Sequence, residues 1–157
     1  MSEWSAVAQQ SVNPNEFIIF TANPVPCQRG LVTSRDDAGV FTLSNYVPSQ
    51  GFSCPCQPAP CAIYLVDFGA NISIPDGGTV GEISLALSLG GVTLPASTMT
   101  VTPAAAGDLF NVSRAIHIAI PCSCGCQTLA VKNISNQAIN VQNANIIFGR
   151  PDLTLSR

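Results

Sequence analysis

Cysteine is the residue type in this chain of 157 residues that could take part in the widest range of chemistry, and it occurs seven times. Within its two clusters the closest cysteines are separated by one residue, whereas zinc sites favour two intervening residues, which let both thiolates face one tetrahedral metal. Six cysteines are therefore weak candidates for a metal site, and all seven are candidates for disulfides or cross-links: Cys27, which stands alone, and the clusters Cys54, Cys56, Cys61 and Cys122, Cys124, Cys126.

The number of cysteines is odd, so pairing within one chain leaves at least one thiol over. Synthesis in a reducing cytoplasm favours thiols, with oxidation only after release from the cell. Disulfides, crowded free thiols and a zinc site therefore remain three alternatives.

Histidine occurs once, at His117, so any catalytic triad or proton relay would have to use it. Its neighbours Ile116 and Ile118 place it in the middle of a strand, whereas acid–base groups usually lie on loops above a rigid scaffold. The chain has no nucleophile elbow and no phosphate-binding glycine motif. The pair Asp36 and Asp37 follows Arg35 in an expected turn, which is typical of a solvated loop, with a Ca²⁺ site as the weaker alternative. We therefore predict no enzyme, no catalytic residue and no cofactor.

The overall charge argues against nucleic acid as a partner. Six Lys or Arg stand against nine Asp or Glu, for a formal net charge of −3, and only 10% of residues are charged, against roughly 25% in average domains. Every charged residue from Asp37 to Asp108 is acidic, so that stretch cannot build a basic groove. We also expect no membrane span and no secretory signal, because no apolar run is long enough and the first residues lack a basic, then apolar, pattern.

Strict alternation of apolar and polar residues indicates an all-β fold. It is clearest from 81 to 94, where Ile83, Leu85, Leu87 and Leu89 share one face and Gly90-Gly91 supplies a hairpin turn. About ten short antiparallel strands in a jelly-roll sandwich are expected, near 16–21, 30–33, 40–44, 62–68, 72–74, 83–89, 92–94, 99–102, 115–120, 127–133 and 139–148. The apolar parity changes within the last segment, which predicts a bulge near Asn143.

Prolines divide the chain into two parts. Residues 1–61 are broken by seven prolines, and we interpret them as an N-terminal extended arm with some strand-forming and cysteine-containing segments. Residues 62–157 are expected to form the main jelly-roll body, the two parts together making one structural unit. The arm carries Trp4, Val7 and Val12, which we expect to pack on a neighbouring subunit or particle, because a free arm would expose the Trp4 side chain.

Several segments in a fixed order carry a resemblance to known proteins: YLVDFGAN at 64–71, PDGGTVG at 75–81, STMTVTPAA at 97–105, FNV at 110–112 and VQNAN at 141–145. In these segments the chain resembles a family of small uncharacterised proteins encoded by gut Firmicutes and by their phages and prophages. It is similar, more distantly, to tumour-necrosis-factor-like jelly rolls that cap collagen-like surface proteins of bacteria. The resemblance implies a trimeric ten-strand jelly roll on a particle or cell surface, although this chain has no collagen-like stretch.

The expected function is therefore structural. We predict a virion protein, a homotrimeric capsid decoration or accessory protein of a tailed phage whose partners are itself and a capsid or other surface-assembly protein. The alternative is a bacterial cell-surface or spore-appendage subunit cross-linked through its cysteines. A carbohydrate-binding module is less favoured, because sugar sites use exposed aromatic platforms and the chain has few aromatic residues.

Overall fold

The computed structural model describes residues 1–27, 29–35, 37–47, 61–121 and 125–153, and twelve β-strands make up most of this part of the chain. Two short 3-10 helices, η1 (Pro95–Ser97) and η3 (Pro151–Leu153), accompany them. The strands are β1 (Ser2–Ala6), β2 (Gln10–Val12), β3 (Ala22–Val25), β4 (Val32–Arg35), β5 (Val40–Leu43), β6 (Cys61–Ser73), β7 (Ile83–Leu89), β8 (Val92–Thr93), β9 (Met99–Val101), β10 (Phe110–Pro121), β11 (Gln127–Asn133) and β12 (Ile139–Gly149).

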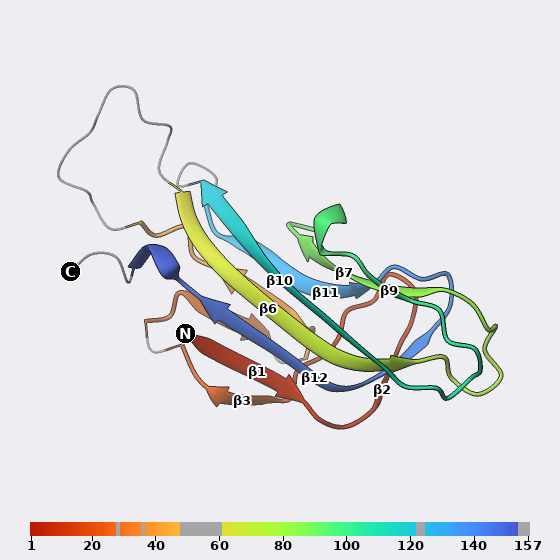
Figure 1. Ribbon diagram of the computed structural model, residues 1–157. Helices are drawn as coiled ribbons and strands as arrows, with labels where there is room; N and C mark the ends of the chain where they lie inside the picture. Colours follow the sequence, from red (N-terminus) through yellow and green to blue (C-terminus); the bar gives the residue numbers. More distant parts are fainter. Residues whose placement is uncertain (28, 36, 48–60, 122–124, 154–157) are drawn as a thin grey trace.

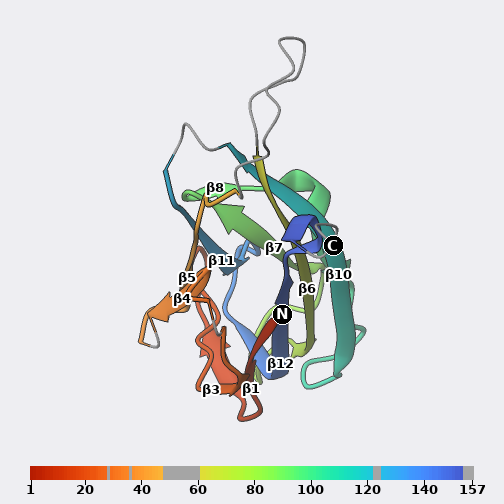
Figure 2. The same cartoon turned by 90° about the vertical axis from the view of Figure 1, so that its left-hand side faces the viewer.

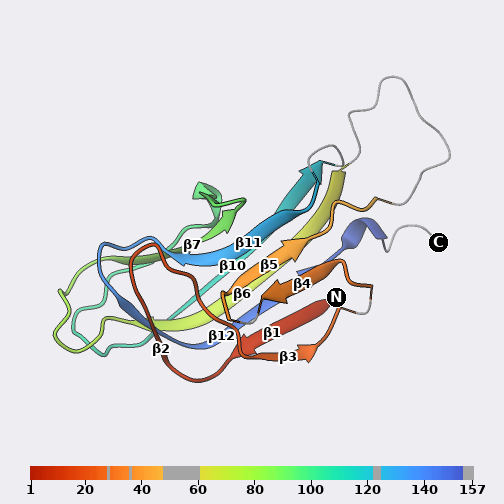
Figure 3. The ribbon, with the colours of Figure 1, turned by 180° about the vertical axis from the view of Figure 1, so that it is seen from behind.

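The strands form two antiparallel sheets packed face to face. The first sheet has the order β10-β6-β12-β1-β3, with β2 also paired to β12, and Figure 1 looks onto it. The second has the order β4-β5-β11-β7-β8, with β9 also paired to β7, and Figure 3 shows it from the opposite side. Figure 2 views the two layers from the side. The predicted all-β jelly-roll sandwich is confirmed.

Two local predictions on turns and bulges are confirmed. Gly90 and Gly91 connect β7 to β8 with φ of 58° and 86°, values that glycine adopts without a steric penalty. The pairing of β12 with β6 shifts register between Gln142 and Asn145, and Asn143 there has a φ of 52°. This irregularity is the bulge predicted near Asn143.

Strand lengths differ from the prediction in β6 and β10. Two separate strands were expected at 62–68 and 72–74, but β6 runs unbroken for 13 residues because Gly69 is paired on both sides, with Ser113 of β10 and Asn145 of β12. Strand β10 ends at Pro121 as expected but begins five residues early, at Phe110. The strand expected at 16–21 reduces to a single bridge between Phe17 and Lys132.

The expectation of an N-terminal arm is wrong for residues 1–12. Strand β1 lies between β12 and β3 inside the first sheet, and β2 pairs with β12. Trp4 and Val12 are 4% and 2% exposed in this chain's own core, while Val7 is 72% exposed. The physical reason is alternation: Ser2, Trp4 and Ala6 point inward. Ser2 and Ala6 are small, so Trp4 fills the space between the sheets.

The core joins the two sheets through an aromatic cluster. The Trp4 ring of β1 lies 5.1 Å from Phe41 of β5 and 5.6 Å from Phe148 of β12, both edge to face. Phe20 packs on Phe41 with centroids 5.4 Å apart. Because the first 47 residues supply Trp4, Phe20 and Phe41, strands from both halves of the chain share one hydrophobic core.

Candidate functional site: the outward face of the first sheet

The first sheet turns one side to the core and the other away from it. In β6 the even positions from Ala62 to Ile72 are buried, whereas the odd positions from Ile63 to Asn71 are partly buried or exposed. We call the outward side the open face, and Figure 1 looks onto it. It contains Glu3, Ser5, Val25, Ile63, Leu65, Asp67, Ser113, Ala115, His117, Ala119, Asn145 and Ile147.

The strand register lines up the residues of the open face in rows. Asp67 of β6 lies opposite Ala115 of β10 on one side and Ile147 of β12 on the other. Ile147 in turn lies opposite Glu3 of β1, and Glu3 opposite Val25 of β3. One row across five strands therefore contains two carboxylates among small and apolar side chains.

Charge on the open face is confined to a few side chains. Asp67 is exposed and makes no ion pair within the described ranges, and His117 is exposed two residues beyond Ala115. The Glu3 carboxylate accepts a hydrogen bond from the side-chain amide of Asn145. The strand residues between these groups are neutral, so the face is mostly apolar or small with isolated charges.

The second sheet has no comparable face at β7. The outward residues Ser84, Ala86 and Ser88 are buried, with exposed fractions of 7%, 0% and 2%. Ser84 Oγ lies 2.7 Å from Thr100 Oγ1 of β9, and the Ser84 amide donates to Ser135 Oγ at 2.7 Å. This part of the second sheet is therefore already covered within the single chain.

The described cysteines lie at one end of the sandwich. Cys61 begins β6 opposite Pro121, the last residue of β10, and Cys126 directly precedes β11. Cys27 lies between β3 and β4, whose Val32 pairs with the same Leu43 that faces Gln127 of β11. Cys54, Cys56, Cys122 and Cys124 lie outside the described residues. We call this end the cysteine pole.

Cys27 has an environment that favours the thiolate. Partial burial alone would raise the pKa of the Cys27 thiol, but backbone hydrogen bonds from Val32, Arg29 and Leu31 outweigh burial and lower that pKa below its ordinary value. Cys126 is exposed and Cys61 is partly buried. The Cys27 thiol is therefore ionised more readily than an ordinary cysteine thiol.

An ion pair between Arg150 and Asp152 joins segments of the chain near the cysteine pole. The Arg150 guanidinium donates from Nε and Nη2 to the two Asp152 oxygens, at 2.8 and 2.7 Å, and from Nη2 to the carbonyl of Tyr46 at 2.9 Å. The Tyr64 hydroxyl lies 2.7 Å from the carbonyl of Ser44 and receives a bond from Arg150 Nη1. These contacts tie β6 and β12 to the chain that follows β5.

The same network shifts three pKa values. Burial would raise the pKa of Asp152, but hydrogen bonds from Arg150 and the Ile63 amide outweigh it and lower that pKa. The hydrogen bond to Asp152 raises the pKa of Arg150 against the effect of burial. Burial raises the pKa of Tyr64 although Arg150 opposes it. The arrangement therefore keeps Arg150 and Asp152 charged and Tyr64 neutral, as a structural ion pair requires.

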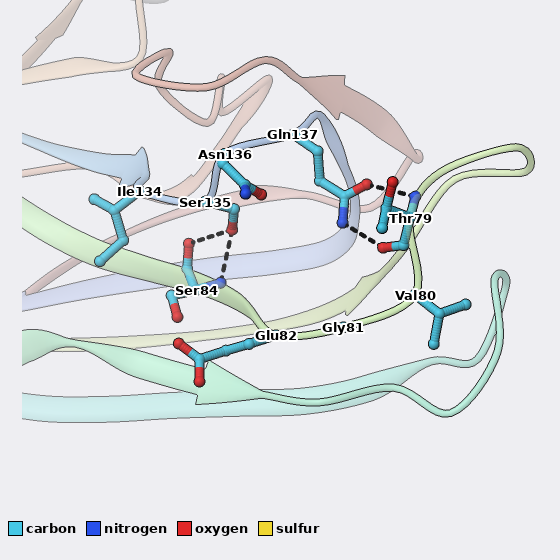
Figure 4. Close-up of a pocket in the computed structure, with 9 residues that line it drawn as sticks. All are labelled: Thr79, Val80, Gly81, Glu82, Ser84, Ile134, Ser135, Asn136 and Gln137. Atoms are coloured by element: carbon cyan, nitrogen blue, oxygen red, sulfur yellow. Dashed lines mark hydrogen bonds between the residues drawn. The ribbon is translucent and has the colours of Figure 1, made fainter.

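A polar depression of about 520 Å³ lies at the other end of the sandwich, between residues 79–84 and 134–137 (Figure 4). Its wall is held by Gln137, whose side-chain amide donates to the carbonyl of Thr79 at 2.6 Å and accepts from the Thr79 amide at 2.9 Å. Ser135 similarly bridges the amide and carbonyl of Ser84. None of the described residues that line the depression is aromatic, so they offer no stacking platform of the kind expected at a sugar site.

The candidate metal ligands are brought together only in part. Within the described ranges, no group of three or more His, Cys, Asp or Glu side chains is arranged to hold a metal ion. No helix there is long and apolar enough to cross a membrane.

The sequence analysis did not identify the open face, to which Leu65, Asp67 and Ile147 belong. The alternation at positions 63, 65 and 67 indicated that these side chains share one side of a strand.

Comparison with solved structures places the fold among known jelly rolls. Neither a protein-family model nor a curated protein matches the sequence. The structure of Eiger TNF from S. frugiperda aligns with a TM-score of 0.65 at 12% identity, over 95% of this chain and 90% of that one. The globular domain of zebrafish complement 1qA aligns with a TM-score of 0.57 at 11% identity, over 92% of each chain. At such low identity the two likenesses establish a shared jelly-roll fold.

Proposed function

We propose that this chain is a non-catalytic structural subunit that assembles with copies of itself, as a homotrimer, through the open face. The observation that carries the proposal is the contrast between the open face and the closed outward side of β7. A five-strand face of small and apolar side chains with few charges resembles the core of a protein interface, where charged residues are depleted.

The proposed setting is the surface of a virion, where the chain would act as a capsid decoration or accessory protein of a tailed phage. The resemblance to phage and prophage proteins supports this setting, and the jelly-roll fold is compatible with it. Position of the gene tests the setting: capsid, portal or terminase genes should lie beside it. A position among spore-coat or cell-wall genes would contradict it.

Assembly through the open face is tested by sedimentation of the full chain. We expect a species of three times the chain mass for the natural sequence. Ala115→Glu should give monomers, because it places a second carboxylate on the face directly opposite Asp67. The matched control is Thr33→Glu, an equal change at an exposed position of β4 on the other sheet, which should assemble normally. A monomeric natural chain, or assembly unaffected by Ala115→Glu, would contradict the proposal.

The second candidate function is a cell-surface or spore-appendage subunit cross-linked by cysteines. The location of Cys27, Cys61 and Cys126 at one pole favours it, together with the lowered pKa of the Cys27 thiol. Covalent cross-links in native material should survive boiling in detergent without reductant. Migration as a monomer on such a gel would exclude this function.

A further inference from the structure

The open face contains two carboxylates that need a partner once water is removed. Asp67 is exposed in the single chain, where water solvates its charge. Burying a carboxylate without a counter-charge destabilises an assembly by much more free energy than an exposed ion pair contributes to stability. An assembly through this face, which is the proposed function on which this inference rests, must therefore supply a positive charge or a proton.

His117 lies where it can supply that positive charge. Asp67 lies directly opposite Ala115, and His117 lies two residues further along β10 on the same side of the sheet. The two side chains are thus diagonal neighbours on adjacent strands, a separation that long side chains bridge. Histidine is also the side chain that gains or loses its charge between about pH 5 and 8.

Apart from the amino group of Met1, the other charged groups around the face are bound to other partners or are negatively charged. On β1, Glu3 is a second carboxylate and accepts from Asn145, and the amino group of Met1 precedes this strand. Beyond β12, Asp152 is bonded to Arg150. On β10 itself, Arg114 donates to the carbonyl of Ala96, away from the open face. The outward residues of β12 and β3 carry no charge.

We propose that His117 is the counter-charge of Asp67 in the assembled protein, so that association through the open face takes up a proton at His117. With His117 neutral, each covered face carries the charges of Asp67 and Glu3. With His117 protonated, one of these charges is compensated at short range. Assembly is therefore stronger at mildly acidic pH and weakens as the pH rises.

The test is the concentration of half-assembly, measured by sedimentation at pH 5.5 and pH 7.0. This range avoids the titration of α-amino groups, which lies at about pH 8. For the natural chain we expect the concentration of half-assembly to be about tenfold lower at pH 5.5 than at pH 7.0. This is the factor that the uptake of one proton produces over one pH unit. His117→Asn should assemble equally at both pH values and as weakly as the natural chain at pH 7.0.

Two further variants separate this mechanism from a general effect of charge. Asp67→Asn should assemble strongly at both pH values, because the carboxylate that needs the proton is gone. Glu82→Gln makes the same change of charge at an exposed residue outside the open face, and it should retain the natural pH dependence. Normal pH dependence in His117→Asn or Asp67→Asn, or pH-independent assembly of the natural chain, would overturn the inference alone. A chain that is monomeric at both pH values would overturn the proposed function as well.

Discussion

The outward sides of the two sheets differ in what covers them, although both belong to strands with the same alternating pattern. On β7 the outward Ser84, Ala86 and Ser88 are buried beneath the chain's own contacts, whereas on β10 the outward Ala115, His117 and Ala119 are exposed. Apart from His117, these side chains are small. The difference therefore comes from what is packed next to each strand and not from the side chains themselves.

This difference shows how the fold distributes stability and interaction. Ser84 is hydrogen-bonded to Thr100 of the neighbouring strand β9 and to Ser135 of the loop after β11, so both segments are held beside β7. On the first sheet, no segment among the described residues lies over the open face (Figure 1). Substitutions on the closed side should thus change stability, and equal substitutions on the open face should change association.

The largest effect is expected in the aromatic core between the two sheets. Trp4→Ala should lower the free energy of unfolding by about 4 kcal/mol, because it removes a buried ring that contacts Phe41 of one sheet and Phe148 of the other. Urea unfolding followed by circular dichroism measures the change. Val7→Ala, at a 72% exposed position of the same terminal segment, is the control and should stay within about 0.5 kcal/mol. Equal losses for the two variants would contradict the placement of Trp4 in the core.

A matched pair of charge substitutions tests the comparison directly. Ala86→Glu should cost about 3 kcal/mol of stability, because Ala86 is fully buried and the new carboxylate has no designed partner. Ala115→Glu should cost less than about 0.5 kcal/mol, since its side chain remains in water in the monomer. Urea unfolding at low protein concentration keeps association out of both measurements. If Ala115→Glu proved the more damaging of the two, the distinction between a closed and an open side would fail.

The sequence predicted the parts of the fold that depend on local pattern. Alternation from Ile83 to Leu89, the Gly90-Gly91 turn and the parity change at Asn143 each have a local physical cause, and each occurs in the structure. Strand β1 escaped prediction because Ser2 and Ala6 are weak hydrophobic signals, and only the partner strands β12 and β3 make this segment a strand. The open face was not predicted for the same reason, because burial of the outward side of a strand depends on its tertiary neighbours.

The smallest effect is expected from a comparison of two carboxylates near β6, Asp152 and Asp67. Asp152 accepts from Arg150 and the Ile63 amide, whereas Asp67 is exposed without an ion pair among the described residues. Asp152→Asn should lower stability at pH 7 by about 2 kcal/mol, because it leaves the buried Arg150 without its counter-charge. Asp67→Asn should change the stability of the monomer by less than about 0.5 kcal/mol.

The pH dependence of that loss follows from the lowered pKa of Asp152 in the folded chain. A carboxyl group whose pKa is lower in the folded state stabilises the fold above its unfolded pKa of about 3.9, and this contribution disappears as the pH falls through the folded value. The stability difference between the natural chain and Asp152→Asn should therefore be full at pH 7 and shrink below about pH 4. Urea unfolding at pH 7, 5 and 3 measures it, with Asp67→Asn as the control. A difference that stayed constant down to pH 3 would show that Asp152 supports the fold through its shape and hydrogen bonds and not through its charge.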